Sequence, residues 1–266
     1  MLSPGSPIIC YVSGMDNITA SPQHQASIYV VAAHPNWRDS RVNHKMRDVA
    51  MGQPHVSVCD LYARYPDYHI DVATEQGHLA NAQLVVLVHP IQWYAMPALL
   101  KLWLDDVFTY GWAYGEGGHA LRGKDLWLVA TTGGPEPSYH PQGYNRYFFD
   151  AFLPPYEQTA ALCGMRFLPP LILHGAHTVS DTEVQQHVAT FGQRLAAYPN
   201  WPELADMDSC PACEVPDQDR PHTPESSTPL PEGWVAEGFA QVKEEPAQRA
   251  GDTEQSPLPP NVLGAK

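Results

Sequence analysis

Short apolar runs alternate with longer stretches of mixed polarity between residues 27 and 198. Five of these runs predict β-strands, at residues 27–33, 55–61, 84–88, 125–130 and 167–173. The stretches between them are long enough for helices, and residues 41–51 have a helical composition. Near-continuous apolar strands joined by helices are typical of a parallel sheet that is covered on both faces. The pattern therefore predicts a doubly wound α/β domain.

Two of the intervening stretches carry clear helix signals. After the third run, apolar residues recur at helical spacing, with Pro97 in the first turn: Met96, Leu99, Leu100, Trp103 and Val107. Near residue 180, Ser180 and Glu183 have capping-box spacing, ahead of an apolar face made of Val184, Val188, Phe191 and Leu195. Five strands with these helices predict a doubly wound fold of the flavodoxin type, with strand order 2-1-3-4-5.

Composition changes after residue 198. Residues 199–266 hold twelve prolines, thirteen Asp or Glu and four Lys or Arg, and so carry an acidic excess of nine within the formal net charge of −14. Such a segment buries too little apolar surface to offset its chain entropy. We expect an acidic, Pro-rich disordered tail at 199–266, a folded domain at 27–198 and a flexible extension at 1–26, in which Met15 is an alternative start.

Charge and cysteine content exclude several classes of function. Outside the tail the chain is mildly acidic and has no basic stripe, so we expect neither nucleic acid nor a polybasic membrane anchor. The five cysteines have no framework spacing, which favours a reducing cytoplasm. Cys210 and Cys213 have ligand spacing, but a single such pair does not predict a metal site. No run is long enough to span a membrane, and residues 8–12 are too short for a signal sequence.

Sheets of this kind bind ligands at the carboxyl ends of their strands. Three of the predicted strands lead there into loops whose residues can bind a ligand. After the first strand, Ser40 can cap the next helix, whose free N–H groups suit a phosphate. The third strand leads into an aromatic turn at 91–94, and the fourth into Thr-Thr-Gly-Gly at 131–134, where glycine lets amides approach a planar ring. The sequence has neither Gly-x-Gly-x-x-Gly nor a P-loop, so a monophosphate is favoured, and the three loops predict a site for flavin mononucleotide (FMN).

The block PxQWYxxPxLLKxWxDxVF at 90–108, followed by the loop at 131–134, resembles the flavodoxin-like NAD(P)H:quinone oxidoreductases. It is more similar still to the ancillary quinone oxidoreductase of the glutathione-regulated potassium-efflux system. Blocks typical of that group recur as Tyr-Pro-Asp at 65–67, HPxQWY at 89–94, GWAYG at 111–115 and Leu-Pro-Pro at 168–170. The resemblance covers residues 28–198.

The resemblance implies an enzyme that uses FMN, accepts a hydride from NAD(P)H and passes two electrons to a quinone in a ping-pong cycle. It assigns the phosphate side of FMN to His34, Ser40, Arg41, Val42 and Asn43. It assigns the isoalloxazine to Ile91, Gln92, Trp93, Tyr94, Thr131, Thr132, Gly133 and Gly134. Tyr139 matches a tyrosine that assists charge relay in the larger quinone reductases, and Asn145 stands where they carry a histidine. Because Asn cannot protonate a quinone, the proton donor is Tyr139, His140 or water.

Simpler interpretations accompany several of these residues. Trp103, Trp112 and Trp127 are expected to pack in the core or an interface. His34 can merely bond backbone, and Lys101 with Asp105 forms a solvated ion pair.

The resemblance further implies a homodimer, to which the aromatic residues at 111–115 also point. It suggests a potassium-efflux transporter as a partner, which would place the protein on the cytoplasmic face of the inner membrane. Two alternatives stay open: a mainly redox-sensing regulatory subunit of that transporter, and a flavoenzyme that reduces azo or nitro compounds.

Overall fold

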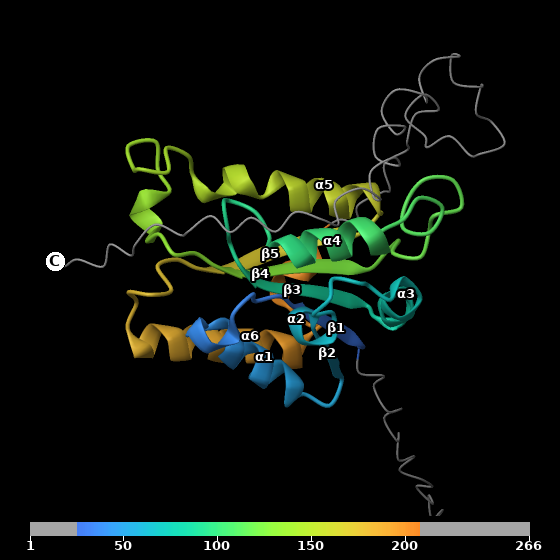
Figure 1. Ribbon diagram of the computed structural model, residues 1–266, viewed down its shortest axis with the longest axis horizontal. Helices are drawn as coiled ribbons and strands as arrows, with labels where there is room; N and C mark the ends of the chain where they lie inside the picture. The colour runs from blue at the N-terminus through green and yellow to red at the C-terminus, as the bar shows by residue number, and fades with distance from the viewer. Residues whose placement is uncertain (1–25, 208–266) are drawn as a thin grey trace, which may run out of the picture. The chain divides into compact units, whose positions relative to one another are not determined.

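The computed structural model describes residues 26–207, which contain a five-stranded, all-parallel sheet between two layers of helices (Figure 1). The strands are β1 (Ile28–Ala32), β2 (Val56–Asp60), β3 (Leu84–Pro90), β4 (Asp125–Thr131) and β5 (Arg166–Leu173). Their order is β2-β1-β3-β4-β5, and each neighbouring pair is parallel. The predicted fold class, strand order and five strands are confirmed.

Six α-helices connect or follow the strands in the described part of the chain: α1 (Asn43–Met51), α2 (Leu61–Arg64), α3 (Val72–Asn81), α4 (Ala98–Val107), α5 (Pro154–Leu162) and α6 (Asp181–Ala197). Helices α4 and α5 lie on one face of the sheet, and α1 and α6 on the other (Figure 1). The capping box of Ser180 and Glu183 is present at the start of α6, as predicted. None of the helices between residues 26 and 207 is long and apolar enough to cross a membrane.

Alternating strand residues supply two separate cores. In β1, Tyr29 and Val31 face the layer containing α4 and α5, whereas Ile28 and Val30 face α1 and α6. This is the alternation expected of a strand buried on both sides. The predicted core tryptophans Trp103 and Trp127 are fully buried, one in each core, and Trp112 is half-buried against the first.

The domain extends further than composition predicts. Residues 199–207, assigned above to the tail, pack on the core that contains α1 and α6: Trp201 is buried and its ring centroid lies 4.9 Å from that of Trp127. The Arg166 guanidinium donates to the carbonyls of Leu204 and Met207. A buried tryptophan offsets the entropic cost of ordering these few residues, so residues 199–207 pack with the domain, although their composition assigned them to the tail. The remaining tail, with Cys210 and Cys213, and residues 1–25, with Met15, lie outside the described residues.

Candidate functional site

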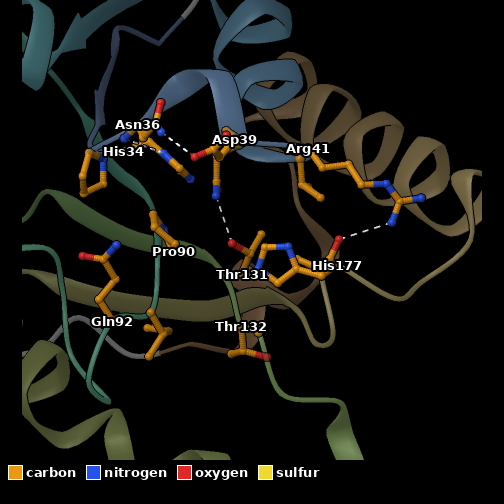
Figure 2. Close-up of a pocket in the computed structure, with 16 residues that line it drawn as sticks. His34, Asn36, Asp39, Arg41, Pro90, Gln92, Thr131, Thr132 and His177 are labelled. Carbon is orange, nitrogen blue, oxygen red and sulfur yellow. Dashed lines mark hydrogen bonds between the residues drawn. The ribbon is translucent and has the colours of Figure 1, made fainter. Parts of the chain in front are cut away.

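The loops that follow β1, β3, β4 and β5 meet around a cavity of about 340 Å³ at the carboxyl end of the sheet (Figure 2). The Ile91 N–H donates to the Thr131 carbonyl at 2.7 Å, so the aromatic turn and the glycine loop are in direct contact. Ten of the thirteen residues predicted to bind FMN line this cavity. The other three, Trp93, Tyr94 and Gly134, line a second cavity of about 200 Å³, which shares Ile91 with the first.

Helix α1 opens toward the first cavity, but it begins two residues later than a Ser40 cap implies. Its N-cap position is Val42, which has no side-chain acceptor. The Ser40 hydroxyl still serves the first turn, because its Oγ accepts the His44 N–H at 3.1 Å. Ser40 therefore supports this helix end from outside the cap position. Lys45 and Met46 donate their N–H groups to the Val42 carbonyl, so the Asn43 N–H is the helical donor left for an anion at this positive end of the helix.

Asn43, which lines the cavity, has a buried polar atom without a partner. Its Nδ2 donates to the Thr131 hydroxyl at 2.9 Å, which links the start of α1 to the end of β4. Its Oδ1 has no hydrogen-bond partner although the residue is only 2% exposed. An unsatisfied buried acceptor costs about 1–3 kcal/mol. A hydroxyl donor in the cavity, such as those on the ribityl chain of FMN, would satisfy this oxygen, so the residues present fit the predicted cofactor.

Arg41 lines the cavity with part of its side chain, but its charge points away from it (Figure 2). The guanidinium pairs with Asp181 at 2.7 Å and donates to the carbonyls of Val179 at 2.6 Å and Ala176 at 3.3 Å. It ties the segment after β5 to the start of α1, across about 140 residues of sequence. Arg41 therefore lines the cavity, and its predicted role as a ligand of the FMN phosphate stays a prediction.

His34 both lines the cavity and bonds backbone, so the two interpretations of this residue coexist. Its Nδ1 accepts the Asn36 N–H at 3.1 Å, and its ring lies 5.3 Å from that of Trp37. Burial lowers the pKa of His34, which favours the neutral imidazole in the absence of a ligand. His177, from the segment after β5, lines the same cavity and was not singled out from the sequence. The signal that could have found His177 in the sequence is that it follows the carboxyl end of a predicted parallel strand.

The aromatic turn adopts a conformation that side chains other than glycine rarely take. Gln92 and Ala95 exchange both backbone hydrogen bonds, at 2.9 and 3.1 Å, and between them Trp93 and Tyr94 have φ of 49° and 64°. Left-handed backbone at two bulky residues stores strain, which is common at functional sites. The turn leaves the Trp93 side chain 93% exposed, whereas the Tyr94 ring stacks on Phe152 at 5.1 Å.

The second cavity contains two of the three predicted catalytic residues. Tyr139 and Asn145 line it, and burial raises the pKa of Tyr139, which keeps the phenol protonated near neutral pH. The Asn145 amide is already engaged on both sides: its Oδ1 accepts the Tyr94 hydroxyl at 3.3 Å and its Nδ2 donates to Ser138 Oγ at 3.0 Å. Asn145 thus bridges the two loops that form the cavity.

The third predicted catalytic residue, His140, lies apart from both cavities. It is exposed, and its ring packs edge-on against Phe148. A different histidine, His174 at the end of β5, stands behind the site: its ring lies 5.1 Å from that of Tyr139, and its Nδ1 lies 3.1 Å from the Thr132 hydroxyl. The Thr132 hydroxyl donates its proton to the Gly134 carbonyl at 2.7 Å, so in the bond between Thr132 and His174 the imidazole Nδ1–H is the donor. These two hydrogen bonds hold the glycine loop in place.

Gly134 is the position in this loop where close approach requires glycine. A Cβ placed there would lie 2.6 Å from the Tyr144 hydroxyl and 2.7 Å from Ser138 Oγ. At Gly133 the nearest such atom is His177 Cδ2, at 3.8 Å. The glycine pair therefore serves two purposes, with Gly134 packing beneath the loop and Gly133 lying open at the cavity.

The chain belongs to the family of proteins with a flavodoxin-like fold, whose model matches residues 26–195. It is 43% identical over 171 residues to the glutathione-regulated potassium-efflux system ancillary protein KefF of Citrobacter koseri, covering 64% of this chain and 96% of the relative. Among solved structures it resembles general stress protein 14 of Treponema denticola in complex with FMN, at 35% identity and a TM-score of 0.58, covering 65% and 97% of the two chains. It also resembles an NADPH-quinone reductase from P. pentosaceus, at 26% identity and a TM-score of 0.57, covering 63% and 96%.

Proposed function

We propose that this protein is an FMN-dependent NAD(P)H:quinone oxidoreductase. The observation that carries the proposal is that three loops, of the kinds that hold a phosphate, a flat ring and its polar edge, line one cavity, where Asn43 Nδ2 bonds Thr131 and the Ile91 N–H bonds the Thr131 carbonyl. Support comes from the solved relative that holds FMN and from the relative titled an NADPH-quinone reductase. When bound, FMN supplies two-electron chemistry between a nicotinamide and an acceptor.

The residues of the first cavity have distinct tasks in this proposal. The first turn of α1, with Ser40 and His34, binds the phosphate, and Asn43 accepts a hydrogen bond from the ribityl chain. The turn at 91–94 and the loop at 131–134 flank the ring system, and free amides of the glycine loop stabilise negative charge at its polar edge.

The second cavity receives the acceptor. Its exposed wall is the Trp93 side chain, which offers a flat surface to a quinone ring. Tyr139 is the proton donor we favour among the three candidates, because its phenol is protonated and faces the cavity, whereas His140 does not line it. Asn145 holds the cavity together through Tyr94 and does not itself transfer a proton.

A homodimer is part of the proposal. Four aromatic side chains near the second cavity are strongly exposed, namely Trp93, Tyr144, Tyr147 and Phe148, and a second copy of the chain would cover them. Trp112 and Tyr114, the aromatics that suggested association from sequence, are instead half-buried against the core. Sedimentation at micromolar concentration should give the mass of two chains, and a monomer would contradict this part.

The relationship to KefF supports a second role, as an ancillary subunit of a potassium-efflux system on the cytoplasmic face of the membrane. The two roles separate in an efflux assay with co-expressed transporter. If Asn43→Leu abolishes quinone reduction and leaves efflux activation intact, the regulatory role is primary. If both are lost, activation depends on the loaded flavin site.

The decisive experiment is a visible absorption spectrum of the purified protein before and after anaerobic NADPH. We expect a flavin spectrum that bleaches with NADPH and recovers with a benzoquinone, and Asn43→Leu should purify with less flavin. An apoprotein that does not take up added FMN would contradict the proposal. Turnover measured in parallel with azo and nitro compounds tests the alternative flavoenzyme, which is favoured if those acceptors are reduced faster than quinones.

A further inference from the structure

The phosphate end of the proposed FMN site has no fixed positive charge directed into it from the described residues. Arg41 is the one Lys or Arg in residues 26–207 that lines this cavity, and its guanidinium is paired with Asp181. The Asp39 carboxylate at the rim accepts a hydrogen bond from the Asn36 side chain and adds negative charge. Besides the amino end of α1, the histidines of the cavity are therefore the groups that can compensate the charge of a phosphate.

His177 is placed to provide that compensation. Its side chain lines the cavity beside Thr131 and close to Gly133 (Figure 2). Its imidazole makes no hydrogen bond to any residue in the described part of the chain, so both ring nitrogens are available to a ligand. The segment that carries it is held rigidly, because Ala176 N–H donates to the Thr132 carbonyl at 2.8 Å and Arg41 binds the Ala176 and Val179 carbonyls.

We infer that His177 binds the phosphate of FMN together with His34, and that Arg41 is a positioning residue that holds the 176–181 segment over the phosphate. This inference rests on the proposed function. An imidazolium donates a charge-assisted hydrogen bond to a phosphate oxygen, whereas a neutral imidazole donates a weaker one. Affinity for a phosphorylated flavin therefore increases as the pH falls and the His34 imidazole gains a proton.

The groups around His177 set the direction of this pH dependence. The charged and titratable neighbours are His34 and Asp39 after β1, Arg41 and His44 at the start of α1, His174 before it and Asp181 after it. Burial is the main cause that lowers the pKa of His34, and the nearby His177 and His44 lower it further, whereas the Asn36 backbone and Asp39 raise it. A bound phosphate favours the protonated form of His34, so binding is coupled to proton uptake.

Binding titrations of the full chain, stripped of flavin, with FMN and with riboflavin test this inference. They are made at pH 6.5 and 8.0 at equal ionic strength, above the second ionisation of the phosphate near pH 6. We expect FMN to bind about three- to tenfold more tightly at pH 6.5 than at pH 8.0, because these are charge-assisted bonds at a partly exposed site. Riboflavin, which lacks the phosphate, should bind equally at both.

Variants assign the effect to individual residues. His177→Gln should weaken FMN binding about three- to tenfold at pH 6.5, with riboflavin unaffected. Arg41→Gln should act in the same way, and the double variant should bind no more weakly than His177→Gln alone, since Arg41 acts through His177. The matched control is His119→Gln, an exposed histidine between α4 and β4 that lines neither cavity and should behave as wild type.

Three other results would contradict either the inference about His177 or the proposed function. FMN binding in His177→Gln with unchanged affinity and pH dependence would overturn the inference and leave the FMN site standing. Equal weakening of FMN and riboflavin would also overturn it, because the effect would not involve the phosphate. If the wild-type chain binds neither flavin, the proposed function itself fails.

Discussion

Glu75 on α3 is a fully buried acidic side chain whose hydrogen-bond partners all lie outside the proposed FMN site. Replacing it tests how much these hydrogen bonds stabilise one face of the sheet. It accepts hydrogen bonds from the Tyr29 hydroxyl at 2.6 Å, the Tyr65 hydroxyl at 2.6 Å and the Trp103 indole at 2.9 Å. Glu75→Ala leaves three buried donors without an acceptor, and each costs about 1–3 kcal/mol. We expect the free energy of unfolding to fall by about 3–9 kcal/mol, a large share of the about 5–15 kcal/mol typical of a domain.

Urea unfolding of the flavin-free chain, followed by tryptophan fluorescence and circular dichroism, measures this loss. Flavin must be absent because a bound ligand shifts apparent stability. Tyr65→Phe, which removes one donor and leaves the carboxylate, should cost about 1.5–3 kcal/mol, and less in the Glu75→Ala background, where the acceptor is already gone. Tyr147→Phe removes an exposed hydroxyl and should change stability by less than about 0.5 kcal/mol. A cost below about 1 kcal/mol for Glu75→Ala would refute the reasoning.

Three further predictions concern stability and the glycine loop. Burial lowers the pKa of His89 and His187 to about 4. Below about pH 6.5 these histidines therefore take up protons in the unfolded chain but not in the native state. The urea midpoint should fall steadily from pH 6.5 to pH 4. His89→Gln should reduce that slope, and a midpoint independent of pH would contradict the assignment. Gly134→Ala should weaken FMN binding about three- to tenfold, measured by fluorescence titration, because its Cβ would lie 2.7 Å from Ser138 Oγ, which is held by Asn145 and the Pro135 carbonyl. Unchanged binding would show that Ser138 and the exposed Tyr144 side chain move aside. Gly77→Ala, inside α3 with open space around it, should raise the free energy of unfolding by about 0.5–1 kcal/mol, and a loss would mean that the helix cannot take a methyl group there.

Sequence alone determined the framework of the site. The strands, the capping box at Ser180 and the loops that lead from the carboxyl ends of β1, β3 and β4 follow from periodicity and chain order, which are local properties. Once parallel strands are placed side by side, the contact between Ile91 and Thr131 follows from topology. Composition was less reliable at the domain boundary, because a single buried tryptophan, Trp201, outweighs the polar residues around it.

Only the tertiary structure decided what the side chains do. Arg41 looks like a phosphate ligand in sequence, yet an aspartate about 140 residues away captures its guanidinium. The resemblance places Asn145 where the larger quinone reductases carry a histidine, yet Tyr94 and Ser138 occupy both ends of its amide. His177 is recognised as a cavity residue only from the structure, which places the segment after β5 against the glycine loop. Backbone elements form from residues that are close in sequence, whereas the direction of a charged or polar side chain depends on partners that folding brings from far along the chain.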